Sequence, residues 1–420
     1  MKTTALGKKA LVTGATGKIG PLLVNELLRQ NFRVRLLLRQ SPASPNLMWH
    51  PDVEISWGDI TDYPAVLDAV SGVNYVFHLA ALLHLNTPPA SIHARYYEVN
   101  VIGTQNIIDA SFRANVKRVV IFSTISVYGK GTYKNIFSET SPVNPLTIYA
   151  KTKFLAEKKV WEKVHENIEA NIEANIDANI EANLQEKVQE NLRENLHKKV
   201  PERSHKNNIS SNSSTCVTIL RLASVYGRHM TGNYLRLIQA VRAGFFCIPV
   251  RNKDLSFYIN CYSGNHRYLS KLNIANKVGL NGGALRTLIH EDDVVSAAIL
   301  AATHPEAAGK TYNLTDGNFH SLEEVVQAIA DALCVRVKIL KIPQKLFKKL
   351  SDFIHMYNHK IKKAPGKNIK KEDYIEKIAF AIDKLMENVV VDGSKIQTEL
   401  GFKPRYNLKN GWNHALWHKK

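Results

Sequence analysis

Tyr149 and Lys153, in the stretch YAKTK, are four residues apart and would lie one turn apart on the same side of a helix. A phenol and an ammonium group in this arrangement could work together in proton transfer, because the positive charge favours the phenolate. The spacing alone does not establish this chemistry, since Tyr-x-x-x-Lys also arises by chance in helices. The elements around the pair have to show whether it can act on a substrate.

A glycine-rich turn near the N-terminus indicates which cofactor such a pair could serve. The run KALVTG is typical of a buried parallel strand, and PLLVNELLRQ has helical spacing. The segment TGATGKIG between them has glycines in the order G-x-x-G-x-x-G. Such a turn lets the backbone approach a pyrophosphate at the helix N-terminus. This context predicts a dinucleotide site formed by Gly14, Gly17, Lys18, Ile19 and Gly20.

The end of the second expected strand bears on the choice between NAD and NADP. The segment LLLRQS contains no acid that could hold the ribose hydroxyls, and Arg39 stands at the tip. An arginine there can pair with a 2′-phosphate. The sequence therefore slightly favours NADP over NAD, although Arg39 could also be a solvated charge.

Two later strand ends predict contacts with other parts of the cofactor. In GDITD, Asp59 and Ile60 occupy a position at which an acid can accept the adenine amino group. His78 ends another strand and is interpreted as a packed histidine without a catalytic role. It is followed by small or apolar residues past which the cofactor could run: Leu79, Ala80 and Ala81.

These segments lie in a chain whose first 160 residues alternate strand and helix patterns. The alternation predicts the α/β class, with a doubly wound parallel-sheet Rossmann fold and a smaller C-terminal α/β substrate domain. The expected organisation is an NAD(P)-binding domain over 1–160, a helical insertion and linker over 161–215, return segments to the Rossmann domain over 216–223 and 285–315, and a substrate domain over 224–284 and 316–420.

The segment 161–215 contains a four-residue repeat, NIEANIEANIDANIEAN, followed by a polar stretch. Because a helix has about 3.6 residues per turn, an apolar residue at every fourth position drifts by about 40° per repeat. No face of the helix stays apolar, so we expect a projecting helix inserted into a working fold. A self-association rod is the alternative. Residues 251–283 also have the composition of an insertion or an elaborated loop.

Composition limits the other classes of function. The four cysteines have no paired spacing, which predicts neither disulfides nor a metal site and is typical of a reducing, cytoplasmic compartment. We expect no signal peptide and no membrane span. The net charge of +19 suggests an anionic partner, but no nucleic-acid-binding motif accompanies it.

The positive charge is concentrated near the C-terminus. Between Arg336 and Lys371 there are twelve Lys or Arg residues and one acid, Asp352. Within this region, 343–371 begins with a basic amphipathic helix pattern, which predicts either a core-facing helix of the substrate domain or loose contact with a membrane surface.

Taken together, the motifs resemble the extended short-chain dehydrogenase/reductase superfamily, in its NAD-dependent epimerase/dehydratase branch. The matching segments run in order along most of the chain: TGATGKIG, GDITD, HLAA, YYEVNVIGTQNIIDAS, VKRVVIFSTISVYG, YAKTK, RLASVYG, LIHEDDVVSAAI, GKTYNLTDG and ELGFKPRYNLKNG. The resemblance is much less specific for the substrate than for the fold and cofactor class.

The resemblance implies catalytic roles for Thr124, Tyr149 and Lys153. Tyr149 would move a proton while the cofactor moves a hydride, Thr124 would hold the substrate oxygen, and Lys153 would also hold the nicotinamide ribose. Ser126, together with Ser123, is an alternative to Thr124 as the hydroxyl that contacts the substrate. Asn100 matches a family position near the catalytic strand, and could instead be a buried structural amide.

The resemblance also implies a nucleotide-linked or lipid-diphosphate-linked sugar as the substrate, C4 epimerisation as the reaction, and a homodimer. Arg286 matches a diphosphate-contacting arginine, and Asn233 opens the helix GNYLRLIQAVRAG of the expected substrate domain. Ser224 departs from the asparagine of the galactose epimerases. The alternatives are an NADP-dependent enzyme like the 3β-hydroxysteroid dehydrogenases or flavonoid-type reductases, and a non-catalytic nucleotide-binding scaffold.

Overall fold

Seven parallel strands form the central sheet, in the order β11-β6-β5-β4-β1-β2-β3. The computed structural model describes residues 8–39, 50–83, 88–131, 136–195, 215–250, 283–362, 382 and 385–417. The strands of the sheet are β1 (Lys9–Thr13), β2 (Arg33–Leu38), β3 (Val53–Trp57), β4 (Tyr75–His78), β5 (Arg118–Thr124), β6 (Cys216–Leu222) and β11 (Lys310–Leu314). Chain order and sheet order change direction at β1 and β4, so the carboxyl ends of these strands border a crevice.

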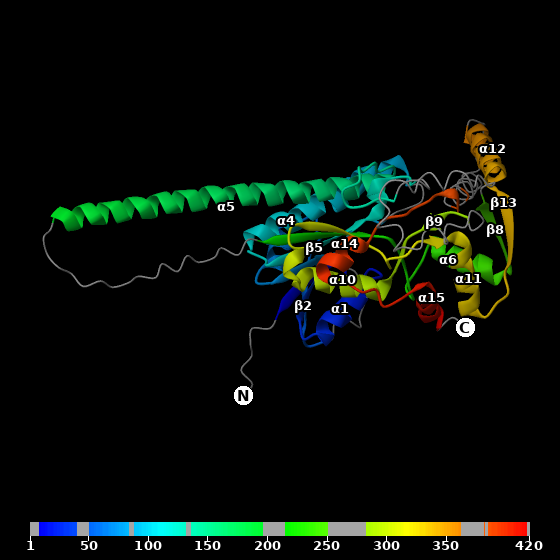
Figure 1. Cartoon of the computed structure of the whole chain (residues 1–420), viewed down its shortest axis with the longest axis horizontal. Helices are drawn as coiled ribbons and strands as arrows, with labels where there is room; N and C mark the ends of the chain where they lie inside the picture. Colours follow the sequence, from blue (N-terminus) through cyan, green and yellow to red (C-terminus); the bar gives the residue numbers. More distant parts are fainter. Residues whose placement is uncertain are drawn as a thin grey trace.

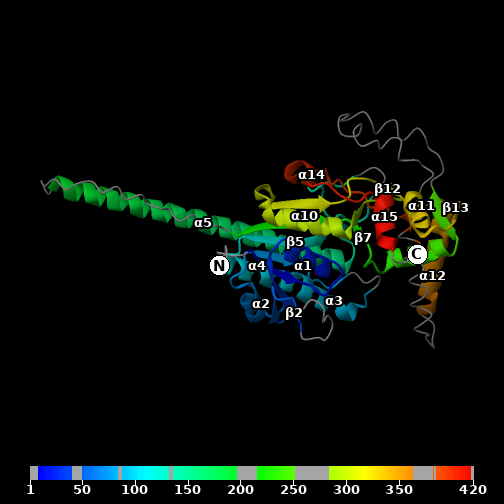
Figure 2. The same ribbon diagram turned by 90° about the horizontal axis from the view of Figure 1, so that it is seen from below.

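Helices cover both faces of this sheet, which confirms the predicted doubly wound Rossmann fold (Figure 2). One apolar core joins the sheet to α1 (Gly20–Arg29), α10 (Glu291–Thr303) and α14 (Ser394–Leu400). The opposite core joins it to α2 (Tyr63–Val70), α4 (Gly103–Arg113) and the start of α5 (Ile148–Asn195). The central strands are apolar almost throughout, as expected for strands covered on both faces.

Short irregular helices connect β4 to α4 and extend β5. They are η2 (Ala90–Ile92), α3 (His93–Tyr97), the π-helical segment η3 (Glu98–Ile102) and η4 (Ile125–Tyr128). A further short helix, η5 (Pro305–Ala307), precedes β11. Through α3 and η3 the chain passes alongside the carboxyl ends of the strands before entering α4.

A smaller α/β unit surrounds a third apolar core. It contains the helices α6 (Asn233–Arg242), α11 (Leu322–Leu333), α12 (Gln344–Lys362) and α15 (Leu408–Leu416) and the strands β7 (Ser224–Tyr226), β8 (Phe245–Val250), β9 (Leu285–Arg286), β10 (Leu288–His290), β12 (His320–Ser321) and β13 (Lys338–Pro343). The strands pair two by two as β10-β7, β12-β9 and β13-β8. Ser321 and Glu324 form a capping box at the start of α11.

The C-terminal segment does not belong wholly to this smaller unit, which corrects part of the predicted domain division. Val391, Ile396, Leu400 and Phe402 are buried in the same core as β1 and α1. The prediction for 316–420 followed the chain order, whereas the apolar side chains of 391–402 pack against the Rossmann sheet.

Helix α5 extends far beyond the body of the molecule (Figure 1). Its first turns are anchored, since Val160, Trp161 and Val164 pack in the core beneath the sheet. Ile168, Ile172 and Ile176 are about half exposed, at 48%, 54% and 52%. The projecting part therefore begins after Val164 and within one continuous helix, slightly later than the predicted bound of 161.

Some predicted segments lie outside the described residues: 196–214 of the insertion and linker, 251–282 of the second predicted insertion, and 363–371 of the basic segment. Among the helices that the structure does describe, none combines the length and apolar character needed to cross a membrane.

Candidate active site

The glycine turn after β1 forms a cradle in which there is no room for side chains. Gly14 has φ +73°, and a Cβ on it would lie 2.7 Å from the backbone nitrogen of Ala80. A Cβ on Gly20 would lie 2.5 Å from the carbonyl oxygens of Gly14 and Ala15. Helix α1 starts here with no side-chain cap on its first backbone N–H groups. These groups and the helix dipole fit a pyrophosphate.

A cavity of about 530 Å³ opens over this cradle. It is lined by all but one of the residues predicted to bind the cofactor: Gly14, Gly17, Lys18, Ile19, Gly20, Arg39, Asp59, Ile60, Leu79, Ala80, Ala81, Tyr149 and Lys153. Thr124 lines the same cavity. The side chain of Lys18 also hydrogen-bonds to the hydroxyl of Thr231, so the glycine turn is connected to a segment of the smaller unit.

The predicted adenine end of the cavity has a second arginine that sequence analysis missed. Arg95 on α3 lies 3.5 Å from the carboxylate of Asp59 and, like Arg39, lines the cavity. Burial alone would raise the pKa of Asp59. Hydrogen bonds from the backbone and hydroxyl of Thr61, with the charges of Arg95 and Arg39, nevertheless hold that pKa below its ordinary value. Asp59 is therefore a carboxylate acceptor between two cations.

Asn100 does not line the cavity and is the buried structural amide that was the alternative interpretation. Its Oδ1 accepts the N–H of Leu82 at 2.7 Å, and its Nδ2 donates to the Leu82 carbonyl at 3.2 Å and to Thr152 at 3.1 Å. Asn100 thus fixes the loop after β4 against α5. The family resemblance placed it near the site, but only the structure shows which way its amide points.

His78 is a packed histidine, as the sequence indicated. Its ring nitrogens lie 2.8 Å from the hydroxyl of Thr13 and 2.9 Å from that of Thr104, and the residue is fully buried. Burial and the nearby charge of Lys153 lower the pKa of His78 to about 3. The imidazole is therefore neutral and joins β1, β4 and α4.

Thr124, Tyr149 and Lys153 come together where β5 ends and α5 begins. The hydroxyl of Tyr149 is hydrogen-bonded to Thr124, whose Oγ1 also accepts the N–H of Ser126 at 3.2 Å. Burial and the nearby Tyr96 raise the pKa of Tyr149 to about 12, although the hydrogen bond to Thr124 lowers it. Burial also lowers the pKa of Lys153 to about 8, while the nearby charge of Glu157 raises it.

These shifts define the protonation state of the site as the structure shows it. At neutral pH the Tyr149 phenol is protonated, and Lys153, with a pKa of about 8, is mostly charged. The phenol can therefore donate a proton to a carbonyl oxygen held by Thr124. Acting as a base would require additional positive charge close to Tyr149.

A buried ion pair behind Lys153 was also missed by sequence analysis. Glu157, one turn after Lys153 on α5, receives Arg221 Nη2 at 2.6 Å and Nε at 3.1 Å, and the hydroxyl of Ser123 donates to it. Arg221 Nη1 also donates to Tyr128 at 2.8 Å. This network fixes α5 to β5 and β6. The continued spacing Tyr-x-x-x-Lys-x-x-x-Glu was the only sequence signal for it.

A second cavity, also of about 530 Å³, meets the first at Thr124, Leu222 and Ala223. Its polar lining includes Ser126, Asn233 and Arg286, the three residues predicted to bind substrate, together with Arg236 and Tyr234. Most of its other lining is apolar: Leu146, Leu237, Ala240, Phe246, Leu322, Leu385 and Val389. The structure therefore brings the predicted substrate residues, and all the predicted cofactor residues except Asn100, to two adjoining cavities. The hydroxyl of Thr124, which we predict to be catalytic, lies between them.

A family model described as "NAD dependent epimerase/dehydratase family" matches residues 10–174, which contain the glycine turn, Thr124, Tyr149 and Lys153. This part of the chain is therefore similar to that family. A Mycobacterium tuberculosis protein named 3 beta-hydroxysteroid dehydrogenase/Delta 5-->4-isomerase is 38% identical over 164 residues, which are 38% of this chain and 43% of the relative.

A relative from Escherichia coli O157:H7 is 29% identical over 157 residues, which are 37% of this chain and 44% of the relative. It is named N-acetyl-alpha-D-glucosaminyl-diphospho-ditrans,octacis-undecaprenol 4-epimerase. The matches to these two relatives thus span less than half of their length. The solved structure of MoeE5 in complex with UDP-glucose and NAD has a TM-score of 0.60, with 21% identity and 98% of both chains covered. At this identity the likeness establishes the fold alone.

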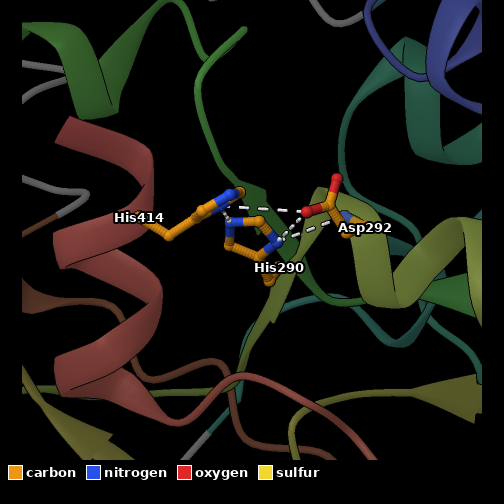
Figure 3. A group of neighbouring side chains, drawn as sticks. All are labelled: His290, Asp292 and His414. Carbon is orange, nitrogen blue, oxygen red and sulfur yellow. Dashed lines mark hydrogen bonds and ion pairs between the residues drawn. The ribbon is translucent and has the colours of Figure 1, made fainter. Parts of the chain in front are cut away.

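Outside the two cavities, His290, Asp292 and His414 form a cluster where α15 meets β10 and α10 (Figure 3). Nε2 of His290 is 3.3 Å from Nδ1 of His414. The other nitrogen of each ring accepts a hydrogen bond: Nδ1 of His290 accepts the N–H of Asp292 at 3.2 Å, and Nε2 of His414 accepts from Arg228 at 2.7 Å. The Asp292 carboxylate is farther from Nδ1 of His290, at 3.7 Å. A metal-bound imidazole needs a proton on its other nitrogen, so this arrangement disfavours a metal ion.

Proposed function

We propose that the chain is an NAD(P)-dependent enzyme that oxidises and reduces a hydroxyl-bearing carbon of a diphosphate-linked sugar, with C4 epimerisation as the overall reaction. The observation that carries the proposal is the position of the Tyr149–Thr124 pair. It lies at the junction between a cavity built on a dinucleotide-type glycine cradle and a second cavity that contains Arg286. Lys153, one turn from Tyr149, supplies the positive charge.

The residues of the chain divide the work in the following way. When bound, the nicotinamide supplies the acceptor or donor of a hydride. Thr124 holds the substrate oxygen, and Tyr149 exchanges one proton with that oxygen. In the oxidative direction the Tyr149 phenolate would take the hydroxyl proton of the substrate while Thr124 holds the oxygen, and a bound oxidised nicotinamide would be the hydride acceptor. In the reductive direction Tyr149 would return the proton to the ketone oxygen, and presentation of the opposite face of the ketone would give the epimer.

Proton exchange at Tyr149 depends on charge. The phenol has a pKa of about 12 before any ligand is bound, which makes it a poor base at neutral pH. The charges of Lys153 and of an oxidised nicotinamide would both lower that pKa. We therefore expect the oxidative step to require Lys153 in its charged form, and to fail as the pH rises through the pKa of about 8.

Three features support a diphosphate-linked sugar. Arg286 and Arg236 line the second cavity, and arginine is suited to bidentate contacts with phosphate. Asn233 and Ser126 supply neutral hydrogen-bonding groups for sugar hydroxyls. One relative is named as a 4-epimerase of a diphospho-undecaprenol sugar, and the structural neighbour MoeE5 was solved with UDP-glucose and NAD. By resemblance to the family we also propose a cytoplasmic homodimer.

The first experiment is mass spectrometry of the nucleotide released when the purified full-length protein is denatured. Stoichiometric NAD would show that the cofactor is recycled within each turnover, as an epimerase requires. An empty protein that binds NADPH reversibly would overturn the epimerase and favour a reductase or dehydrogenase.

Tyr149→Phe provides the second test. We expect kcat on a UDP-hexose or polyprenyl-diphosphate sugar panel to fall by about 10²- to 10⁴-fold, with cofactor retention unchanged. Turnover equal to that of the unmodified protein would refute the catalytic assignment. If the unmodified protein also showed no turnover with any alcohol or ketone offered, the non-catalytic scaffold would be favoured.

A second candidate function is NADP-dependent oxidation of an apolar alcohol such as a sterol. The apolar part of the second cavity, formed by side chains that include Leu237 and Phe246, favours it. The relative named as a 3 beta-hydroxysteroid dehydrogenase/isomerase also supports it. NADP reduction by a sterol panel, without turnover of any nucleotide sugar, would select this candidate over the epimerase.

A further inference from the structure

Helix α12 (Gln344–Lys362) carries apolar side chains on a side that faces away from the protein. It stands at the end of the molecule opposite the projecting part of α5 (Figure 1). Leu346 is 58% exposed, Leu350 49%, and Phe353 on the same side 58%. Phe347 is only 7% exposed and faces inward.

The helix therefore has two apolar sectors with different surroundings. At 100° per residue, Phe347 and Ser351 lie on the sector that packs against the body, and both are buried. Leu346 and Leu350 lie on the adjoining sector, which is solvent-exposed. The sequence analysis left a core-facing helix and a membrane-contacting helix as alternatives. In the structure, one sector of α12 is core-facing and the other is open.

The charges beside the open sector are almost all positive. Lys345 and Lys349 lie on the sector of the helix surface next to the exposed leucines, and Lys348 lies on the sector beyond them and is also exposed. Between 336 and 371 the sequence has twelve Lys or Arg residues and one acid, Asp352, and the net charge of the chain is +19. An apolar ridge flanked by lysines is the pattern of a helix that lies in the plane of a lipid interface.

We propose that α12 docks this protein on an anionic membrane surface, with Leu346 and Leu350 entering the interface and the lysines contacting anionic headgroups. A second copy of the chain is a poorer occupant, because pairing two such faces would bring their lysines together. The helix cannot span the bilayer, so the contact is peripheral.

The position of α12 in the fold gives this contact a consequence for the site. The helix packs against β13 and β8. Phe246 on β8 lines the apolar part of the second cavity. Docking through α12 would therefore bring the lipid interface close to β8, which borders the second cavity. The docking proposal itself does not depend on the identity of the substrate.

The test is co-sedimentation of the full-length protein with vesicles of phosphatidylcholine, with and without 30% phosphatidylserine, at low and high salt. We expect binding to the anionic vesicles at low salt. The double variant Leu346→Ser/Leu350→Ser should weaken it by at least tenfold, and each lysine of Lys345, Lys348 and Lys349 changed to Gln should weaken it by about fivefold.

Ile168→Ser/Ile172→Ser is the matched control, because these side chains are 48% and 54% exposed on the projecting part of α5. This variant should bind like the unmodified protein. Absence of binding to anionic vesicles at low salt would overturn the proposal. Equal binding by the Leu346/Leu350 variant would overturn it too, because the overall charge would then account for the binding. Self-association that is lost in that variant, without vesicle binding, would assign the face to a second copy.

Discussion

The buried ammonium of Lys153 should make the stability of the protein depend on pH in a way that one substitution removes. Lys153 is 2% exposed, and burial lowers its pKa from 10.5 to about 8. Between these two values the unfolded chain binds a proton that the folded protein does not. The free energy of unfolding should therefore rise with pH across this window, and at pH 7 the burial penalty is fully present. At about 1.4 kcal/mol per pH unit, the whole effect is about 3 kcal/mol.

The assay compares the unmodified protein with Lys153→Met by guanidinium denaturation at pH 7.5, 8.5, 9.5 and 10.5. Guanidinium is itself a salt, so it screens surface charges while leaving the desolvation of Lys153 in place. We expect the stability of Lys153→Met relative to the unmodified protein to fall by about 3 kcal/mol from the lowest to the highest pH. Groups that titrate in both proteins cancel in this difference.

The matched control is Lys159→Met, on the same helix. Lys159 is exposed and paired with Glu162 at 2.8 Å, and that hydrogen bond raises its pKa. A raised pKa contributes stability that is lost as the pH increases, so this variant should not reproduce the trend of Lys153→Met. A stability difference for Lys153→Met that stays constant from pH 7.5 to 10.5 would show that burial does not depress the pKa of this lysine. The proposed loss of oxidative turnover near pH 8 would then have no basis.

Three further predictions concern the surroundings of the site. Glu157→Gln should destabilise the protein by about 3–5 kcal/mol, because it leaves Arg221 buried without its partner. This loss should be smaller in an Arg221→Met background. If the stability losses of the two single variants simply add in a double-mutant cycle measured by urea denaturation, the prediction is wrong. Arg39→Ala should raise KM for NADPH by about tenfold or more in steady-state assays while leaving KM for NADH unchanged. Equal changes in the two KM values would show that Arg39 does not bind a 2′-phosphate. Deletion of 166–208 should leave kcat and Tm unchanged, since the apolar residues of α5 up to Val164 provide its anchoring; lost activity in a correctly folded variant would give the insertion a role in the site.

Much of the Rossmann fold could be predicted because its signals are local. Strands β1, β2, β4, β5 and β6 each contain a short apolar run, and parallel pairing follows from the helices between the strands. Strand β3 has the sequence VEISW, which contains no such run, and it was not predicted. The pairing of β9 with β12 has no such signal. It joins two-residue strands, Leu285–Arg286 and His320–Ser321, whose alignment depends on the packing of the smaller unit.

The residues that sequence analysis missed have a common physical cause. Arg95 meets Asp59 across 36 residues of chain, and Arg221 meets Glu157 across 64. In each pair the two members come from different elements, and charged residues are frequent on helices whether or not they are paired. The two interpretations of Asn100 could not be separated from the sequence for a related reason, because chain position does not reveal which way a buried amide points.

The division between the two cavities explains why the reaction is easier to infer than the substrate. The family match over 10–174 includes the glycine cradle, Thr124, Tyr149 and Lys153, to which we assign the proposed hydride and proton transfer at a hydroxyl carbon. It ends before 224–250 and 283–322, from which Asn233, Arg286 and much of the apolar lining of the second cavity come. Because the cavities meet at Thr124, Leu222 and Ala223, the second can change its shape and charge while the geometry of the first is kept. Relatives named for sterols and for diphosphate-linked sugars can therefore resemble the same part of this chain, and the choice between these substrates depends on the second cavity.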